Sequence, residues 1–158
     1  MSFFAYPNET PASSEQIEQL LPDASDDEWA TLLKHTRRRR FGPGDAVVTA
    51  GAPDRSLYLV LNGVLEVLVL QGRQRYRRIA TVGTGSVIGE LSFFDGGTRS
   101  ALVRAVTLTE LAELTPAEFD AFAIADPGLA RRLLFDLGRI LAHRLRIAQQ
   151  TETIAGVN

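Results

Sequence analysis

The sequence predicts a mainly β fold with flanking helices: a jelly-roll-like β-roll preceded by short N-terminal helices and followed by a long C-terminal helix. Three observations predict this class. Between residues 37 and 115, short runs rich in β-branched and aliphatic residues alternate with glycine turns, a pattern typical of sandwiches and rolls. Helix-start signals precede and follow this region, and the apolar spacing becomes helical after it. A chain of 158 residues, 45% of them hydrophobic, can bury one core unaided.

The N-terminal part is expected to contain one clear helix. Residues 1–12 are expected to form a flexible arm, and residues 13–36 a helical segment. Within that segment, Ser25 and Glu28 occupy the two reciprocal positions of a capping box. The sequence therefore predicts a helix that begins after Ser25 and ends near His35.

The central region, residues 37–115, is expected to form the roll. Residues 37–40 suit a strand edge, and residues 42–48 are expected to form a turn and then a strand. Further strands are expected over residues 56–61, 64–70, 75–82, 101–106 and 110–114. Asn62-Gly63 lies between two of these runs and is the strongest short signal for a two-residue type I′ hairpin. A hairpin is therefore expected there.

Two helices are expected after the roll, over residues 116–150. Thr115 and Glu118 form a second capping box, with Pro116 at the first helical position. Asp126-Pro127 repeats the start signal, for a helix that runs to about residue 149. One apolar stripe follows this helix: Leu129, Leu133, Leu137, Ile140, Leu141, Leu145 and Ala148. Residues 151–158 are expected to be a frayed tail.

Composition and charge exclude several classes of function. The formal net charge of −2 argues against nucleic-acid binding driven by overall basicity. The sequence has no cysteine, which excludes disulfides, cysteine-held iron–sulfur clusters and thiol redox chemistry. No apolar run approaches the ~20 residues needed to cross a bilayer, and the first residues do not resemble a signal peptide. The two histidines lack metal-ligand spacing. We expect a cytoplasmic protein without membrane or direct nucleic-acid contacts.

Two groups of arginines are expected to be solvated surfaces. Arg37 to Arg40 form a run that suits the exposed side of an edge strand. Arg73, Arg75, Arg77 and Arg78 suit the surface of a hairpin. Neither group is expected to bind nucleic acid.

The segment of residues 83–105 concentrates the groups that can bind an anion. Its glycines, Gly89 among them, allow sharp turns and close approach of a ligand to the backbone. Residues 90–94 are long enough for one helical turn, whose first N–H groups have no partner inside the helix. A short loop then delivers Arg99 and Ser100 before the next strand. A guanidinium can bind phosphate through two parallel hydrogen bonds, and the hydroxyl and amides can take further oxygens.

Glu90 lies in the middle of this anion-binding segment. A carboxylate beside a phosphate is explained if it accepts a hydrogen bond from a hydroxyl on the same ligand, as a ribose supplies. The residues therefore favour a ligand that carries both a phosphate and a sugar. No nucleophile–base pair or carboxylate dyad is evident, so a binding protein is expected and not an enzyme.

Residues 88–105, IGELSFFDGGTRSALVRA, resemble the phosphate-binding cassette of cyclic nucleotide-binding domains. The shared pattern is GEL, a short loop, then Arg, a small residue and Ala. The resemblance extends to RFGPGDAVVTAGAPDRSLYLVLNGVLEVLV, residues 40–69, and covers roughly residues 40 to 149. Such domains occur in the bacterial catabolite activator protein, in regulatory subunits of cAMP-dependent kinase and in cyclic nucleotide-gated channels. The resemblance implies their double-stranded β-helix and a sensor of a cyclic purine mononucleotide, without a further cofactor.

Carried over by position, the resemblance assigns roles within the cassette. Glu90 is expected to accept from the ribose 2′-hydroxyl, and Gly89 to permit the close approach. Arg99 is expected to pair with the exocyclic phosphate oxygens, helped by Ser100 and by the amides around Leu91.

Further ligand-binding residues are expected around the cassette. Ser92 and Ala101 belong to it, Val67 and Ile79 are expected to line the pocket, and Arg144 on the last helix falls near a position that contacts adenine in the catabolite activator protein. Ser100 favours cAMP, because cGMP-selective members of the family often carry Thr there. We expect cAMP, with cGMP as the alternative.

The expected output is a lid-like movement of residues 128–149. The apolar stripe of this helix can be buried in two ways, against the roll alone or against a second copy, because in the bacterial regulators this helix pairs with its twin. We expect a homodimer through the C-terminal helix, together with an effector protein that the sequence does not identify. About ten residues follow the helix, so we expect a sensor domain without a helix-turn-helix. One alternative is therefore the sensor half of a catabolite activator-type transcription regulator without its DNA-binding domain. The other is a degenerate module that keeps the shape and binds no ligand.

Overall fold

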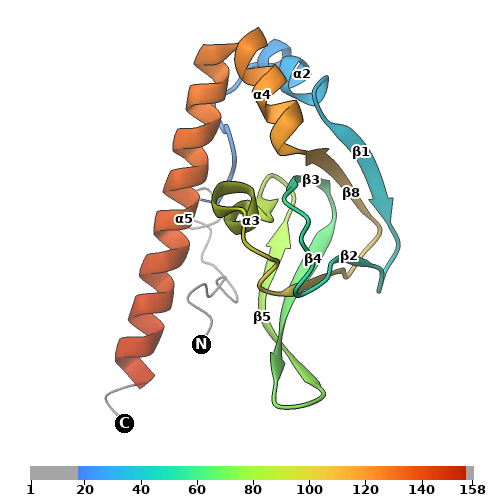
Figure 1. The fold of residues 1–158 in the computed structure, drawn as a ribbon, viewed down its shortest axis with the longest axis vertical. Coiled ribbons are helices and arrows are strands. Elements are labelled where there is room, and N and C mark those ends of the chain that lie inside the picture. Colours follow the sequence, from blue (N-terminus) through green and yellow to red (C-terminus); the bar gives the residue numbers. More distant parts are fainter. Residues whose placement is uncertain (1–17, 156–158) are drawn as a thin grey trace.

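The computed structural model describes residues 18–155, and Figure 1 shows a roll of strands with one long helix standing beside it. The elements are α2 (Asp26–Leu33), β1 (Arg37–Phe41), β2 (Ala46–Val48), β3 (Leu57–Asn62), β4 (Val64–Gln71), β5 (Arg75–Gly83), β6 (Val87–Ile88), α3 (Glu90–Asp95), β7 (Leu102–Ala105), β8 (Thr109–Leu114), α4 (Pro116–Ala125) and α5 (Pro127–Ala155). The predicted fold class, mainly β with flanking helices and a long last helix, is confirmed.

The strands form two four-stranded sheets in which every paired neighbour is antiparallel. Their orders are β1-β8-β3-β6 and β2-β7-β4-β5. Side chains that alternate inward along both sheets fill the space between them, Val60 and Leu65 among them. A second apolar cluster joins the outer side of the first sheet to the helices. The roll therefore has its own core and carries the helices on one side.

The predicted hairpin at Asn62-Gly63 is wrong. Strands β3 and β4 flank this dipeptide but belong to different sheets, β3 pairing with β8 and β4 with β5 and β7. Gly63 has a φ of +114°, and a Cβ there would lie 2.8 Å from the Cα of Thr109. The glycine is thus needed because the backbone crosses from one sheet to the other close to β8. Consecutive strands pair directly only at the β4–β5 hairpin, among the described residues.

The predicted helix starts are confirmed. Both capping boxes, Ser25 with Glu28 and Thr115 with Glu118, make their two reciprocal hydrogen bonds. At the start of α5, Asp126 Oδ1 accepts from the amide of Leu129 at 3.1 Å. These contacts satisfy amides that have no partner inside the helices.

The ends of the chain differ in part from expectation. The predicted arm at 1–12 lies outside the described residues, and so do residues 13–17 of the predicted helical segment. Residues 18–25 form turns and no helix, and α5 continues through part of the predicted tail to Ala155.

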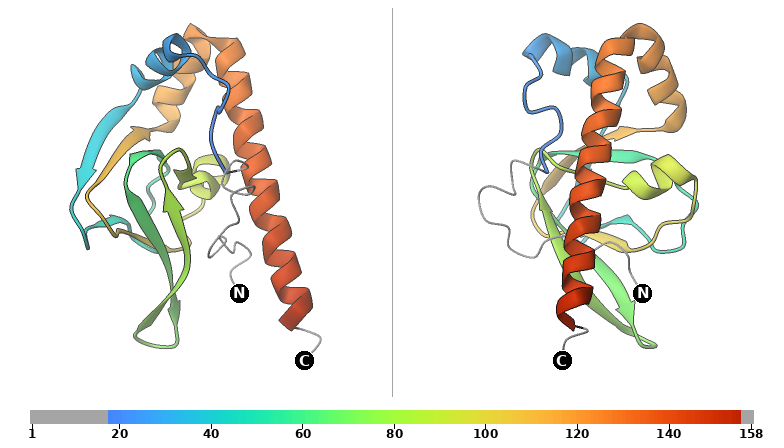
Figure 2. Two further views of the ribbon diagram at one scale, coloured as in Figure 1. Left: turned by 180° about the vertical axis from the view of Figure 1, so that it is seen from behind. Right: turned by 90° about the vertical axis from the view of Figure 1, so that its left-hand side faces the viewer.

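Helix α5 has two apolar faces. Most of the predicted stripe is buried: Leu133, Leu137 and Ile140 are 0% exposed and pack within the chain's own core. The expectation that this stripe meets a second copy is therefore corrected for its buried members. A separate face remains uncovered by described residues: Leu134 is 38% and Phe135 65% exposed. Figure 2 shows α5 lying against the rest of the chain along one side only.

The arginine-rich strands are solvated, as expected. Strand β1 lies at the edge of its sheet, with Arg37 to Arg40 exposed. Arg38 and Arg39 pair with Glu110 and Glu113 of β8. The arginines of the β4–β5 hairpin are exposed as well, and this hairpin projects from the body of the roll (Figure 1). No helix among residues 18–155 is both long and apolar enough to cross a membrane.

Candidate ligand-binding site

The site is built around one sharp turn between β6 and α3. Gly89 has a φ of +84°, a conformation that residues with a Cβ rarely adopt. A Cβ there would lie 2.6 Å from Arg99 Nη1 and 2.7 Å from the carbonyl oxygen of Ser56. Glycine is therefore required at this position both for the turn and for the space that Arg99 occupies.

Arg99 is held inside the roll. Its side chain is 3% exposed, and Nη1 donates to the carbonyl of Gly89 at 3.0 Å. Nη2 donates to the carbonyl of Ser56 at 2.6 Å and to Asp54 Oδ2 at 2.8 Å. Its Nε has no hydrogen-bond partner among the described residues. The guanidinium is thus oriented by the roll, and these contacts leave one of its buried donors unused.

Asp54 supplies the negative charge that faces Arg99. Burial raises the pKa of Asp54, but the hydrogen bonds from Arg99 and from the backbone of Ser56 outweigh it, so the pKa lies below its ordinary value. Burial, followed by the charge of Asp54, raises the pKa of Tyr58 to about 12. At neutral pH the protonated Tyr58 hydroxyl therefore donates to the ionised Asp54, at 3.2 Å.

Glu90 opens α3 and is 0% exposed. Its Oε1 accepts from Arg144 Nη1 at 2.8 Å, and Arg144 is itself 0% exposed. A buried carboxylate needs charged or hydrogen-bonding partners, and here α5 supplies one across the interface between helix and roll. The structure therefore brings together two residues that are 54 positions apart in the sequence.

The other predicted site residues lie at different depths. Val67 is 1% exposed inside the roll, and Ile79 is half-buried and packs against the same cluster. Ser92 and Ala101 are buried, Leu91 is half-buried and Ser100 is exposed. The cassette thus presents buried charges beside a solvent-facing hydroxyl. The ligand contacts of all these residues remain predictions.

Sequence reasoning missed three participants. Asp54 and the carbonyl of Ser56 hold Arg99, and Glu18 holds Arg144. The turn at residues 51–54 was visible as Gly-Ala-Pro-Asp, but nothing in the sequence connects it to Arg99. Glu18 lies in a segment without any pattern that would mark it.

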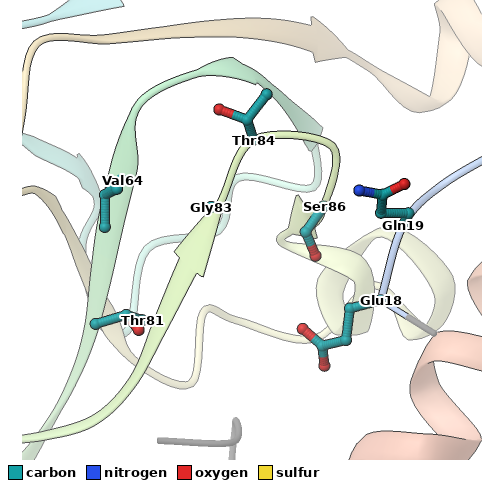
Figure 3. Close-up of a pocket in the computed structure, with 7 residues that line it drawn as sticks. All are labelled: Glu18, Gln19, Val64, Thr81, Gly83, Thr84 and Ser86. Atoms are coloured by element: carbon teal, nitrogen blue, oxygen red, sulfur yellow. The ribbon is translucent and has the colours of Figure 1, made fainter. Parts of the chain in front are cut away.

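A cavity of about 320 Å³ opens beside this network. It lies between the ends of β4 and β5 and the N-terminal segment, as Figure 3 shows. Its lining residues are Glu18, Gln19, Val64, Thr81, Gly83, Thr84 and Ser86. Two of them, Glu18 and Ser86, also contact Arg144. The cavity therefore adjoins the buried ion pair of Arg144 and Glu90, with these two side chains between them.

Comparison with known proteins identifies the cassette and its surroundings. Residues 38–126, more than half of the chain, match the family model of the cyclic nucleotide-binding domain. The cAMP-activated global transcriptional regulator Vfr of Pseudomonas aeruginosa is 31% identical over 119 residues, covering 73% of this chain and 54% of Vfr. Glutaminase 2 of Bradyrhizobium diazoefficiens is 33% identical over 126 residues, covering 80% of this chain and 19% of that protein.

The fold comparison agrees. The crystal structure of the catabolite activator protein of Thermus thermophilus matches with a TM-score of 0.75 and 28% identity, over 85% of this chain and 62% of that one. The chain therefore spans about half the length of the curated regulator Vfr and about a fifth of the glutaminase.

Proposed function

The chain belongs to the cyclic nucleotide-binding domain family, and we propose that it is a sensor of cAMP, with cGMP as the alternative ligand. One observation carries this proposal: two opposite charges are buried on either side of Gly89. Glu90 is 0% and Arg99 4% exposed. A cyclic nucleotide offers a phosphate for the cation and a ribose hydroxyl for the carboxylate. The site is therefore suited to a ligand that has both groups close together.

The phosphate is proposed to replace Asp54 on Arg99. The side chain of Asp54 is 41% exposed, so it can turn to solvent when another anion arrives. The exchange keeps one negative charge beside the guanidinium, which avoids leaving a buried cation unpaired. The buried Nε of Arg99 then gains an acceptor.

Glu90 and Arg99 are proposed to bind and not to hydrolyse the ligand. Arg144 engages the carboxylate of Glu90, and backbone carbonyls hold Arg99, which suits positions that fix a ligand. Incubation of the protein with cAMP should therefore leave AMP undetected by chromatography. Accumulation of AMP in proportion to protein concentration would show an enzyme.

Isothermal titration calorimetry with cAMP and cGMP tests the ligand directly. We expect saturable binding of one ligand per chain, tighter for cAMP, and no comparable binding of 5′-AMP. Absence of heat from both cyclic nucleotides at high micromolar concentration, with protein that is folded by circular dichroism, would contradict the proposal. That result would favour the degenerate module.

The output is proposed to be the position of α5. Arg144 of α5 contacts Glu90, so a ligand that binds Glu90 alters a contact between α5 and the roll. The ligand therefore interacts differently with the docked and the displaced positions of α5, and this difference can shift the helix. The chain has no cysteine, so spin labels can be placed at Thr81→Cys on the roll and Arg146→Cys on α5. We expect cAMP to change the distance distribution between the labels. Identical distributions with and without bound cAMP would refute the coupling.

Homodimerisation is proposed to use the uncovered face of α5 and not its buried stripe. A groove on this face is lined by Leu134, Phe135, Gly138, Arg139 and Ala142. Leu145, a member of the predicted stripe that is 38% exposed, lies further along α5. Light scattering should show a dimer for the natural chain and a monomer for Phe135→Arg. A dimer that withstands this substitution would place the interface elsewhere. We also propose a cytoplasmic protein that signals to an effector protein.

A second candidate function is the sensor part of a transcription regulator. The similarity to Vfr, 31% over 73% of this chain, favours it. Sequencing the gene beyond codon 158 tests this candidate, because a DNA-binding domain would follow in the same reading frame.

A further inference from the structure

We propose that Glu18 is a positioning residue of the nucleotide site, acting through Arg144 on Glu90. This inference rests on the function proposed above and adds a residue from outside the cassette and outside the roll. Glu18 lies before α2, is 9% exposed, and is 126 positions from Arg144 in the sequence.

The contacts of Arg144 divide between the two edges of its guanidinium. Nε donates to Glu18 Oε1 at 3.0 Å, and Nη2 lies 3.4 Å from Glu18 Oε2. Nη1 donates to Glu90 Oε1 at 2.8 Å. A carboxylate that meets Nε and Nη2 together fixes the plane of the guanidinium. Glu18 therefore sets the direction in which Nη1 points toward Glu90.

The loop before α3 supports the same arrangement. Nη2 of Arg144 also donates to Ser86 Oγ at 3.2 Å and to the carbonyl of Val87 at 3.1 Å. Both acceptors belong to the segment that leads into Gly89. Arg144 thus joins the N-terminal segment, the glycine-rich loop and the start of α3 at one buried point.

The backbone around Glu18 is fixed on two sides. The amide of Leu20 donates to the carbonyl of Gly85 at 2.9 Å, and the amide of Leu21 donates to Asp136 Oδ2 of α5 at 2.8 Å. Arg139 Nη2 donates to the carbonyl of Gln19 at 2.9 Å. The segment of residues 18–21 is therefore held between the loop and α5, and Glu18 projects from it beside the cavity in Figure 3.

This arrangement predicts how Glu18 affects the ligand. A ribose 2′-hydroxyl that donates to Glu90 needs a carboxylate in a fixed orientation. Arg144 provides that orientation, and the bidentate contact with Glu18 sets the plane of its guanidinium. In Glu18→Gln the amide keeps one acceptor and brings two donors toward a cation, so the bidentate contact is lost. The effect should be confined to ligands that use the 2′-hydroxyl.

The experiment compares cAMP with 2′-deoxy-cAMP by calorimetry. The natural chain should prefer cAMP, and Glu18→Gln should weaken cAMP binding roughly 5- to 20-fold while changing 2′-deoxy-cAMP affinity less than about twofold. The matched control is Glu28→Gln. It removes the ion pair between Glu28 and Arg132 of α5, which lies away from the cassette. This control should keep the preference of the natural chain.

Three other outcomes decide against the proposal. Equal weakening of both ligands by Glu18→Gln shows a merely structural role, and unchanged or tighter cAMP binding shows that Glu18 does not orient Glu90. If Glu18→Gln does not fold, Glu18→Asp replaces it, because aspartate keeps the charge and shortens the side chain. This variant should also reduce the preference for cAMP over 2′-deoxy-cAMP, and an unreduced preference overturns the proposal. Absence of cyclic nucleotide binding by the natural chain instead contradicts the proposed function itself.

Discussion

Arg99 and Arg144 are both buried at the cassette, yet they are held in different ways. Among residues 18–155, Arg99 donates to residues 54, 56 and 89, all within the roll. The acceptors of Arg144 come from the N-terminal segment, the loop before α3 and α3 itself, while the arginine belongs to α5. The roll alone orients Arg99, whereas Arg144 reaches its place only when α5 is docked.

Under the proposed function, this difference suits the two arginines to different tasks. A cation that is oriented before the ligand arrives loses little side-chain entropy on binding, so Arg99 suits affinity. A cation whose contacts depend on the position of a helix suits communication between the ligand and that helix. Substitutions can separate the two tasks, because stability and affinity are measured independently.

The largest effect is expected for Arg144→Met on stability. Removing the cation leaves the carboxylates of Glu90 and Glu18 in a buried place without this partner, and breaking a buried ion pair costs about 3–5 kcal/mol. Urea unfolding measures this change. Arg146→Met, an exposed neighbour on the same helix, is the control and should change the unfolding free energy by less than about 0.5 kcal/mol. Equal effects of the two variants would contradict the assigned role of Arg144.

Arg99→Ala is expected to act chiefly on affinity. Loss of a charge-assisted phosphate contact should weaken cAMP binding by about 2–3 kcal/mol, or roughly 100-fold. Stability should fall less than in Arg144→Met, because Asp54 can turn to solvent. Calorimetry measures the affinity, with Arg78→Ala on the exposed hairpin as the control. An affinity within twofold of the natural chain would exclude Arg99 from the phosphate site.

Gly89→Ala is expected to disturb the position of Arg99 without removing its charge. The left-handed backbone alone costs a residue with a Cβ about 1–2 kcal/mol, and the new Cβ would lie 2.6 Å from Arg99 Nη1. We expect lower stability by thermal unfolding and weaker cAMP binding in the same variant. Gly83→Ala is the control, because a Cβ there meets nothing within 4 Å. Indistinguishable behaviour of the two variants would show that Gly89 has no steric role.

The smallest effect is expected from Asp54→Asn, and it depends on pH. The pKa of Asp54 is lowered in the folded chain, so its ionised form adds stability above the unfolded-state pKa, and this stability is lost as pH falls through the folded pKa. In the natural chain the loss should appear at and below about pH 3.8, and it should be smaller in Asp54→Asn. Urea unfolding between pH 6 and 3 measures both curves. Parallel curves would mean that Asp54 is not linked to folding through Arg99.

The sequence predicted those parts of the molecule that local patterns determine. The capping boxes formed as expected because their partners lie three residues apart. The cassette was recognisable because Gly89, Glu90 and Arg99 lie within eleven consecutive residues. In both cases the residues that determine the structure are close together in the sequence.

Long-range contacts account for what was wrong or missed. Asn62-Gly63 is a local turn signal that does not determine with which strand the next segment pairs, and here β3 and β4 pair in different sheets. Glu18 and Asp54 meet their arginines across 126 and 45 positions, and no periodicity marks such a meeting. The spacing of the α5 stripe likewise showed which residues share a face but not that the chain's own core covers it.

The two faces of α5 have a consequence for how such a protein evolves. The buried members of the stripe, such as Leu137, and the uncovered face, with Phe135 at 65% exposure, lie on different sides of one helix. Substitutions at the buried members must preserve the core and the docking of Arg144, whereas substitutions on the outer face leave both in place. The surface that α5 presents can therefore change without altering the contacts of Arg144 at the cassette.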